Sequence, residues 1–385
     1  MATTSIPIPQ TVAKAIPWYL WTLTAAVFLV TLGGQTDVSW HRSIGRDGFW
    51  IPPHMMVYAC GLLAALSCGY LLLASTFGTR EDLRATSIHL LGLRAPTGIF
   101  LTAWGGLTML ASAPFDNWWH NAYGLDVQVQ SPPHIVLLAG TWAVCLGTLL
   151  LAAAEMNRAR ETRESSLPYE RIFLLVGALA VIHLMSYSMS YTFDTRLHQA
   201  RPYLVMSTGV PFALAALSTA SRRKWTATIL TGLYTAFMLA LVWILPLIPA
   251  HPALGPVYQN VTHLIPPKFP ILLLVPALVL DLLRQRALKP LTAAILSGTA
   301  WLTLLVAAEW PFATFLMTPY AANRFFGTQY LDFGTPPNNP DALRIFENPQ
   351  HGPHLFAGLA LATAAAILAT FAGNIFGRWM QDIQR

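Results

Sequence analysis

Two short segments of the chain carry the same three ionisable side chains at nearly the same spacing. The first set is Asp37, His41 and His54, and the second is Asp116, His120 and His134. In each set the aspartate precedes a histidine by four residues, and another histidine follows 13 or 14 residues later, directly after proline. Two imidazoles and one carboxylate are a suitable ligand set for a transition metal, so the pattern predicts two metal sites.

The composition places these sets in a membrane protein. Of the 385 residues, 55% are hydrophobic and only 10% are charged, whereas soluble domains carry about 25% charged residues. Aspartate and histidine are costly in a hydrocarbon environment, and where they cluster they usually have a function. The net charge of +6 is accounted for by basic loops on one membrane face, so no nucleic-acid partner is expected.

The apolar segments predict an all-α polytopic membrane protein, because each is close to the roughly 20 residues that a spanning helix needs. About ten spans are predicted, at 16–34, 52–75, 96–113, 132–155, 171–190, 202–220, 226–248, 268–283, 290–311 and 354–377.

Basic residues predict the orientation of these spans. Lysines and arginines gather in alternate connections, at 80–94, 158–171, 222–224 and 284–289, and near both chain ends. The positive-inside rule then places both termini and these loops in the cytoplasm. Nine of the 11 histidines lie in or beside the opposite connections. We therefore expect a multi-pass protein of the cell inner membrane, with the metal sites at the periplasmic or outer face.

The spans also suggest five repeated helical hairpins. Every second span opens with a proline beside a polar residue, as in Pro53-His54, Pro133-His134 and Pro353-His354. Internal repeats are common in membrane folds. The chain divides into a metal-binding four-helix region at 1–155 and six further spans at 156–385, with a long outer loop at 312–352.

The hairpins would position the ligands as follows. If the first helix of a hairpin continues through Asp-x3-His, both side chains share one face. The prolines then deliver the second histidine from the start of the next helix. Three ligands leave coordination positions open, and neutral imidazole suits copper, iron and zinc alike. The alternative is that Asp and His are hydrogen-bonded helix caps, with Trp40, Trp118 and Trp119 in an aromatic belt.

Other ionisable residues are secondary candidates. Asp47 and Asp126 recur in the two copies, either as partners that orient a ligand imidazole or as solvated turn residues. Weaker candidates for metal binding are Asp194, His198, Glu309, His351 and His354. A salt bridge of Asp194 with Arg196 or Arg201 is an equal alternative. A transporter of organic solutes would instead be expected to show polar residues or broken helices at mid-membrane.

Segment 35–56, QTDVSWHRSIGRDGFWIPPHMM, resembles the metal-binding stretch of the C subunit of copper membrane monooxygenases, the family of particulate methane monooxygenase and ammonia monooxygenase. The family pattern there is similar to D-x3-H-x12-H, with a tryptophan before the first histidine and an Arg-Asp pair. A neighbouring family site is similar to N-x3-H-x13-H, and this chain has Asp116 at the asparagine position. The resemblance covers residues 16–155.

The resemblance implies that both sets bind copper and that the same six residues are catalytic. It implies a copper-dependent membrane oxidoreductase, a monooxygenase or a subunit of one, that activates O2 to oxidise a small or hydrophobic substrate. Such an enzyme would need an electron donor and either other membrane subunits or further copies of itself. The alternative is a copper-binding membrane protein for uptake, storage or delivery without catalysis.

Overall fold

The computed structural model describes residues 15–45, 48–78, 80–124, 131–188, 194–253, 261–330 and 349–384. Ten helices of eleven residues or more make up most of this part of the chain: α1 (Trp18–Ser43), α2 (Pro52–Phe77), α4 (Thr97–Tyr123), α5 (Pro132–Glu161), α6 (Leu167–Ser188), α7 (Ala200–Ser221), α8 (Thr226–Ile244), α9 (Leu274–Arg284), α10 (Pro290–Leu316) and α12 (Gly352–Asp382). The short elements are α3 (Glu81–Arg84), the antiparallel strands β1 (Ile88–Leu90) and β2 (Leu93–Ala95), and single 3-10 turns at Asp194–Arg196, Leu245–Leu247, Pro319–Ala321 and Thr328–Tyr330.

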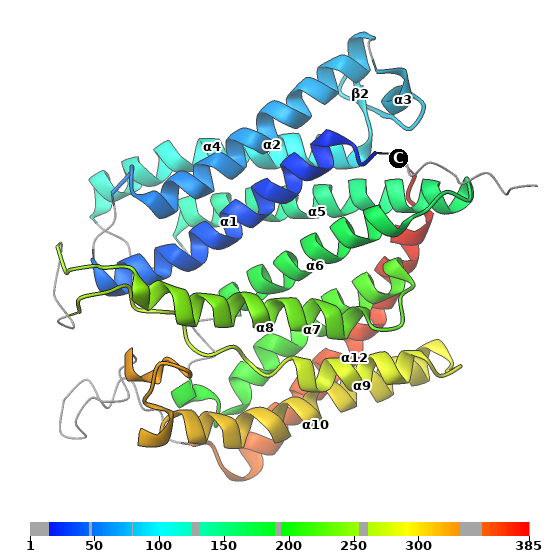
Figure 1. Cartoon of the computed structure of the whole chain (residues 1–385). Coiled ribbons are helices and arrows are strands. Elements are labelled where there is room, and N and C mark those ends of the chain that lie inside the picture. Colours follow the sequence, from blue (N-terminus) through cyan, green and yellow to red (C-terminus); the bar gives the residue numbers. More distant parts are fainter. Residues whose placement is uncertain are drawn as a thin grey trace, which may run out of the picture.

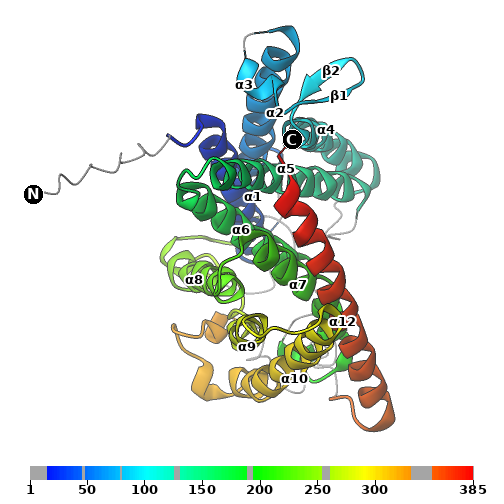
Figure 2. The ribbon, with the colours of Figure 1, turned by 90° about the vertical axis from the view of Figure 1, so that its right-hand side faces the viewer.

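The helices lie side by side in two groups (Figures 1 and 2). In the first group α2 packs on α1 and α4, α4 packs on α5, and α6 contacts both α1 and α5. In the second group α12 crosses α7 and α10, while α9 packs against α8 and α10. The helix α6 joins the groups, because it also contacts α7 and α8.

Eight of the described helices are long and apolar enough to cross a membrane, namely α2, α4, α5, α6, α7, α8 with its 3-10 turn, α10 and α12. Their outward faces carry large apolar side chains, such as Leu62, Leu66 and Leu73 on α2, which are half exposed or more. Contact with the acyl chains of a bilayer accounts for apolar side chains on the outside of a bundle. The chain is thus an all-α polytopic protein.

The eighth predicted span, 268–283, is not one continuous helix. Residues 264–273 contain no helix, and α9 begins only at Leu274. The non-helical backbone is buried inside the bundle, where the side chains of neighbouring helices accept its N–H groups. The N–H of Leu272 donates to Glu309 Oε2 at 2.9 Å, and that of Ile271 donates to the Tyr234 hydroxyl at 3.1 Å. Irregular backbone is tolerated at membrane depth only with such partners.

Both ends of the described chain lie at the same end of the bundle. The Tyr19 hydroxyl near the start of α1 donates to Glu155 of α5 at 2.8 Å, and the Asn157 amide of α5 donates to the carbonyl of Met380 near the end of α12 at 2.9 Å. The α3 turn and the β1–β2 hairpin lie at this end too (Figure 1). The assignment of this end to the cytoplasm rests on the basic loops alone.

Candidate metal centres

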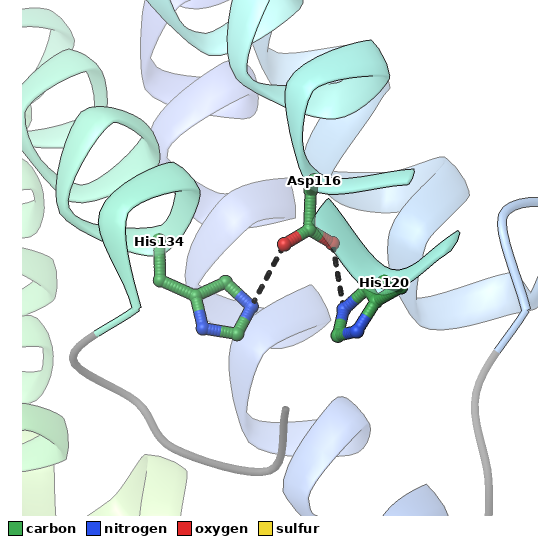
Figure 3. A group of neighbouring side chains, drawn as sticks. All are labelled: Asp116, His120 and His134. Atoms are coloured by element: carbon green, nitrogen blue, oxygen red, sulfur yellow. Dashed lines mark ion pairs between the residues drawn. The ribbon is translucent and has the colours of Figure 1, made fainter. Parts of the chain in front are cut away.

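The second predicted set forms a compact cluster between α4 and α5. Asp116 and His120 stand one turn apart near the end of α4, and His134 comes from the first turn of α5 (Figure 3). The Nε2 atom of His120 lies 3.3 Å from Asp116 Oδ2, and that of His134 lies 3.6 Å from Asp116 Oδ1. Among the described residues, this is the only group of three or more His, Cys, Asp or Glu whose ligand atoms all lie within 4.8 Å of one another.

The first predicted set repeats this arrangement between α1 and α2. The carboxylate of Asp37 again faces two imidazoles. His41 Nε2 lies 3.6 Å from Asp37 Oδ2, and His54 Nε2 lies 3.5 Å from Asp37 Oδ1. Its three ligand atoms do not converge within the 4.8 Å that the second set satisfies. The second cluster is therefore the more compact of the two.

The spacing within both clusters fits a shared metal ion. Two ligand atoms bound at 2.0–2.1 Å to one tetrahedral ion lie roughly 3.3 Å apart. The observed separations of 3.3–3.6 Å match this value, whereas a direct charge-assisted N–H···O bond is shorter, at about 2.7–2.9 Å. Moreover, Asp37 Oδ1 and Asp116 Oδ1 are buried and accept no hydrogen bond. A buried carboxylate oxygen in this state is costly unless a cation binds it.

The helices extend far enough to bring these ligands together. The first and third predicted spans end at 34 and 113, but α1 runs to Ser43 and α4 to Tyr123, so each Asp-x3-His lies on one helical face. Prolines occupy the first turn of α2 and α5, where a missing N–H does no harm. Consequently His54 and His134 stand on rigid backbone.

The end of α1 is also fixed from outside its own hairpin. The hydroxyl of Ser39 donates to the carbonyl of Ile265 at 2.5 Å, and the N–H of Ile265 donates to Ser43 Oγ at 2.6 Å. Both serines are buried. These bonds tie the helical turn between Asp37 and Ser43 to the non-helical segment 264–273.

Glycines set the approach of α4 to α5. A Cβ added at Gly105 would lie 2.7 Å from the carbonyl of Gly140, and one added at Gly98 would lie 2.7 Å from the carbonyl of Gly147. Small residues let membrane helices pack backbone to backbone. This close packing determines how far His134 lies from Asp116.

One cavity of about 210 Å³ joins the two clusters. Asp37 and His54 line it from one side, and Asp116 and His134 from the other. Most of the remaining wall is apolar, with side chains such as those of Val30, Val57, Leu137 and Leu138. Both clusters therefore face the same cavity, which is large enough for a small molecule.

Helix α6 contributes polar groups to this cavity. These residues are not among the site residues that the sequence predicts. His183 is 8% exposed, and its Nε2 atom is buried without a hydrogen-bond partner. Trp142 of α5 packs against it, with ring centroids 6.1 Å apart. Ser186 of α6 also lines the cavity, beside Gln35 of α1. In the sequence, His183 could be recognised only by its position near the predicted outer face. Its orientation toward the clusters depends on the packing of α6 against α1.

The other predicted candidates that the structure describes do not join these clusters. Asp47 and Asp126 lie outside the described residues. His351 and His354 are exposed, whereas Glu309 is buried against Leu272. His198 is buried, and its Nε2 lies 2.8 Å from the Thr314 hydroxyl.

The positive charge that acts on Asp194 comes from a residue other than the two arginines that the sequence suggested. Asp194 is 2% exposed. Burial raises its pKa to about 6, while the positive charge of Lys268 opposes this shift. Lys268, rather than Arg196 or Arg201, supplies the opposite charge that acts on this carboxyl group.

A group of aromatic side chains lies beside the second cluster. Trp118 and Trp119 lie on α4 next to Asp116, and Trp118 and Tyr123 are exposed. The ring of Trp118 packs on that of Phe115, with centroids 6.0 Å apart. An aromatic belt would account for these tryptophans but not for the convergence of three ligand atoms on one point.

Comparisons with protein-family models, with curated proteins and with solved structures find no match to this chain, so the proposed function rests on the residues and geometry described above.

Proposed function

We propose that the chain is a copper-dependent membrane oxidoreductase, a monooxygenase or a subunit of one, that acts on a small or hydrophobic substrate. The observation that carries this proposal is the pair of Asp/His/His clusters facing one largely apolar cavity. The resemblance of segment 35–56 to the copper monooxygenase family selects copper over iron or zinc, which the same ligands also suit.

Each cluster has the donors and the open coordination that O2 chemistry needs. Asp37, His41 and His54 would hold one ion, and Asp116, His120 and His134 the other. Bound copper would supply a redox-active centre with positions free for O2 or substrate.

The protein itself would bind and orient the substrate. The apolar cavity wall would take up a hydrophobic molecule from the bilayer, and the imidazole of His183 would offer it one hydrogen bond. Electrons would come from a donor outside the chain, such as a quinol or a partner subunit. We further propose that the clusters lie at the periplasmic face of the inner membrane.

Metal analysis of purified protein tests the sites directly. His41→Ala and His120→Ala should each lose about half of the bound copper, because each substitution opens one cluster and leaves the other intact. His251→Ala and His89→Ala are matched controls, because these exposed histidines lie outside both clusters. If the two cluster variants retain the copper content of the wild type, the ligand assignment is wrong.

A second function, copper uptake or delivery without catalysis, is favoured by the non-helical segment 264–273. Broken helices with buried polar groups are common at the binding sites of transporters. Oxygen consumption with a chemical reductant and copper uptake into chelator-loaded liposomes separate the two functions. Copper-loaded protein that moves copper but never consumes O2 would contradict the oxidoreductase proposal.

A further inference from the structure

A cluster of buried charges lies beside the non-helical segment, away from the two metal centres. It consists of Asp194, Lys268 and Glu309, whose charges act on one another. Asp194 and Glu309 are 2% and 1% exposed, and the Lys268 Nζ atom is buried. Ionisable residues inside a membrane bundle are expensive, and they usually mark a pathway for ions or protons.

The cluster has an uneven charge balance. Two carboxyl groups share one lysine ammonium group, so full ionisation would leave a buried net negative charge. Glu309 Oε2 accepts one bond, from the N–H of Leu272, whereas Asp194 Oδ1 is buried without a hydrogen-bond partner. A proton held by one carboxyl group would remove the excess charge.

The other titratable groups around the cluster come from each neighbouring element. Tyr203 of α7 donates its hydroxyl proton to the carbonyl of Leu197, and Tyr234 of α8 accepts a bond from the N–H of Ile271. His198, which precedes α7, lies against Trp310 of α10. Among the described residues, none of these groups supplies a further fixed positive charge at the cluster.

A second, smaller cavity lies between Lys268 of this cluster and the cavity that joins the two Asp/His/His clusters. It has a volume of about 30 Å³ and is lined by Lys268, Tyr234, Gln35 and Ser186 among others. A volume above about 10–15 Å³ with several polar partners is enough for a water molecule. Gln35 and Ser186 line both cavities, and the Gln35 amide donates to the Ser186 hydroxyl at 2.6 Å. This hydrogen-bonded pair is thus the boundary between the two spaces.

We propose that Asp194, Lys268 and Glu309 form a buried proton-binding site that exchanges protons with the metal-centre cavity across the boundary formed by Ser186 and Gln35, with the Ser186 hydroxyl as the relay. The hydroxyl of Ser186 accepts the bond from the Gln35 amide and donates to the carbonyl of Ile182 at 2.8 Å, and rotation of this hydroxyl would let it pass a proton to a water molecule in the small cavity. Reduction of O2 consumes protons, and a largely apolar cavity has few groups of its own that could supply them. The use of the protons for catalysis rests on the proposed function, but the protonation of the cluster and its connection to the cavity do not.

Infrared difference spectroscopy of the purified protein between acidic and alkaline buffer tests the proton site. The wild type should show the carbonyl band of a buried protonated carboxyl group, and Asp194→Asn or Glu309→Gln should remove it. Glu309→Gln keeps an oxygen to accept the bond from Leu272, so the fold is expected to survive. Glu164→Gln, at an exposed glutamate, is the control and should keep the band. If the band is absent from the wild type or persists in both variants, the site is refuted.

The connection is tested by the rate at which this band shifts after transfer to D2O. Ser186→Ala should slow the exchange severalfold without removing the band. Ser188→Ala is the matched control on the same helix, because its hydroxyl bonds to the carbonyl of Leu184 and lines neither cavity. Equal rates in both serine variants would refute the relay. None of these measurements needs bound metal, so failure of the copper assignment would be seen separately, in the metal analysis.

Discussion

At the scale of single residues, the central feature is an aspartate that faces two imidazoles in each cluster. The separations of 3.3–3.6 Å are too long for good hydrogen bonds and match the spacing of ligands around one ion. The same cavity contains His183, whose buried Nε2 atom has no partner. A buried imidazole nitrogen without a hydrogen bond lowers stability, and proteins keep such a group where function needs it.

We therefore predict that His183→Leu raises stability while it lowers activity. Removing a buried imidazole without a partner should stabilise the detergent-solubilised protein by about 1–3 kcal/mol, since an unsatisfied buried polar group costs that much. His198→Leu is the matched comparison and should lower the melting temperature, because His198 bonds to Thr314. Thermal unfolding checks both variants. A lower melting temperature for His183→Leu would show that the ring is satisfied or packed in a way that leucine cannot replace.

At the scale of elements, each cluster depends on a helical hairpin with proline in the first turn of its second helix. In the second hairpin, glycines bring α4 and α5 into backbone contact. The clusters are built alike but supported differently, because Ile265 from a distant segment holds the end of α1.

Gly105→Ala tests the support of the second cluster. The added Cβ would lie 2.7 Å from the Gly140 carbonyl and 2.8 Å from the Val144 nitrogen. Overpacking of this kind typically costs about 1–3 kcal/mol, and the displaced helix should weaken copper binding at the second cluster more than at the first. Gly69→Ala in α2 is the control, because a Cβ there meets nothing within 4 Å. Melting temperatures and copper content measure the two effects; a melting temperature for Gly105→Ala equal to that of the control would contradict the packing argument.

At the scale of the whole molecule, the two helix groups share α6, and the metal-centre cavity lies against this helix. The clusters lie at the end of the bundle opposite to the α3 turn and the strand hairpin (Figure 1). The basic loops predict that this latter end faces the cytoplasm.

Cysteine accessibility in intact cells tests the orientation. In a variant without Cys60, Cys68 and Cys145, which are all buried, Arg163→Cys should react with a membrane-impermeant maleimide only after lysis. His251→Cys should react in intact cells, because His251 is exposed at the opposite end. The reverse pattern would place the metal centres in the cytoplasm.

The sequence by itself determined the class of fold and singled out the residues of both clusters. Apolar runs and the spacing of Asp37, His41 and His54 are local features, and helical geometry converts an i, i+4 spacing into one face without further information. The orientation likewise follows from the local distribution of arginine and lysine, and it stays a prediction.

Only the tertiary structure decided how these parts meet. An apolar run at 268–283 looks helical by composition, but Tyr234 and Glu309 accept hydrogen bonds from its backbone and allow residues 264–273 to stay non-helical. The packing of α6 between α1 and α5 turns two separate clusters into walls of one cavity and places His183 there. Such contacts join residues far apart in sequence, and no local periodicity encodes which helices become neighbours.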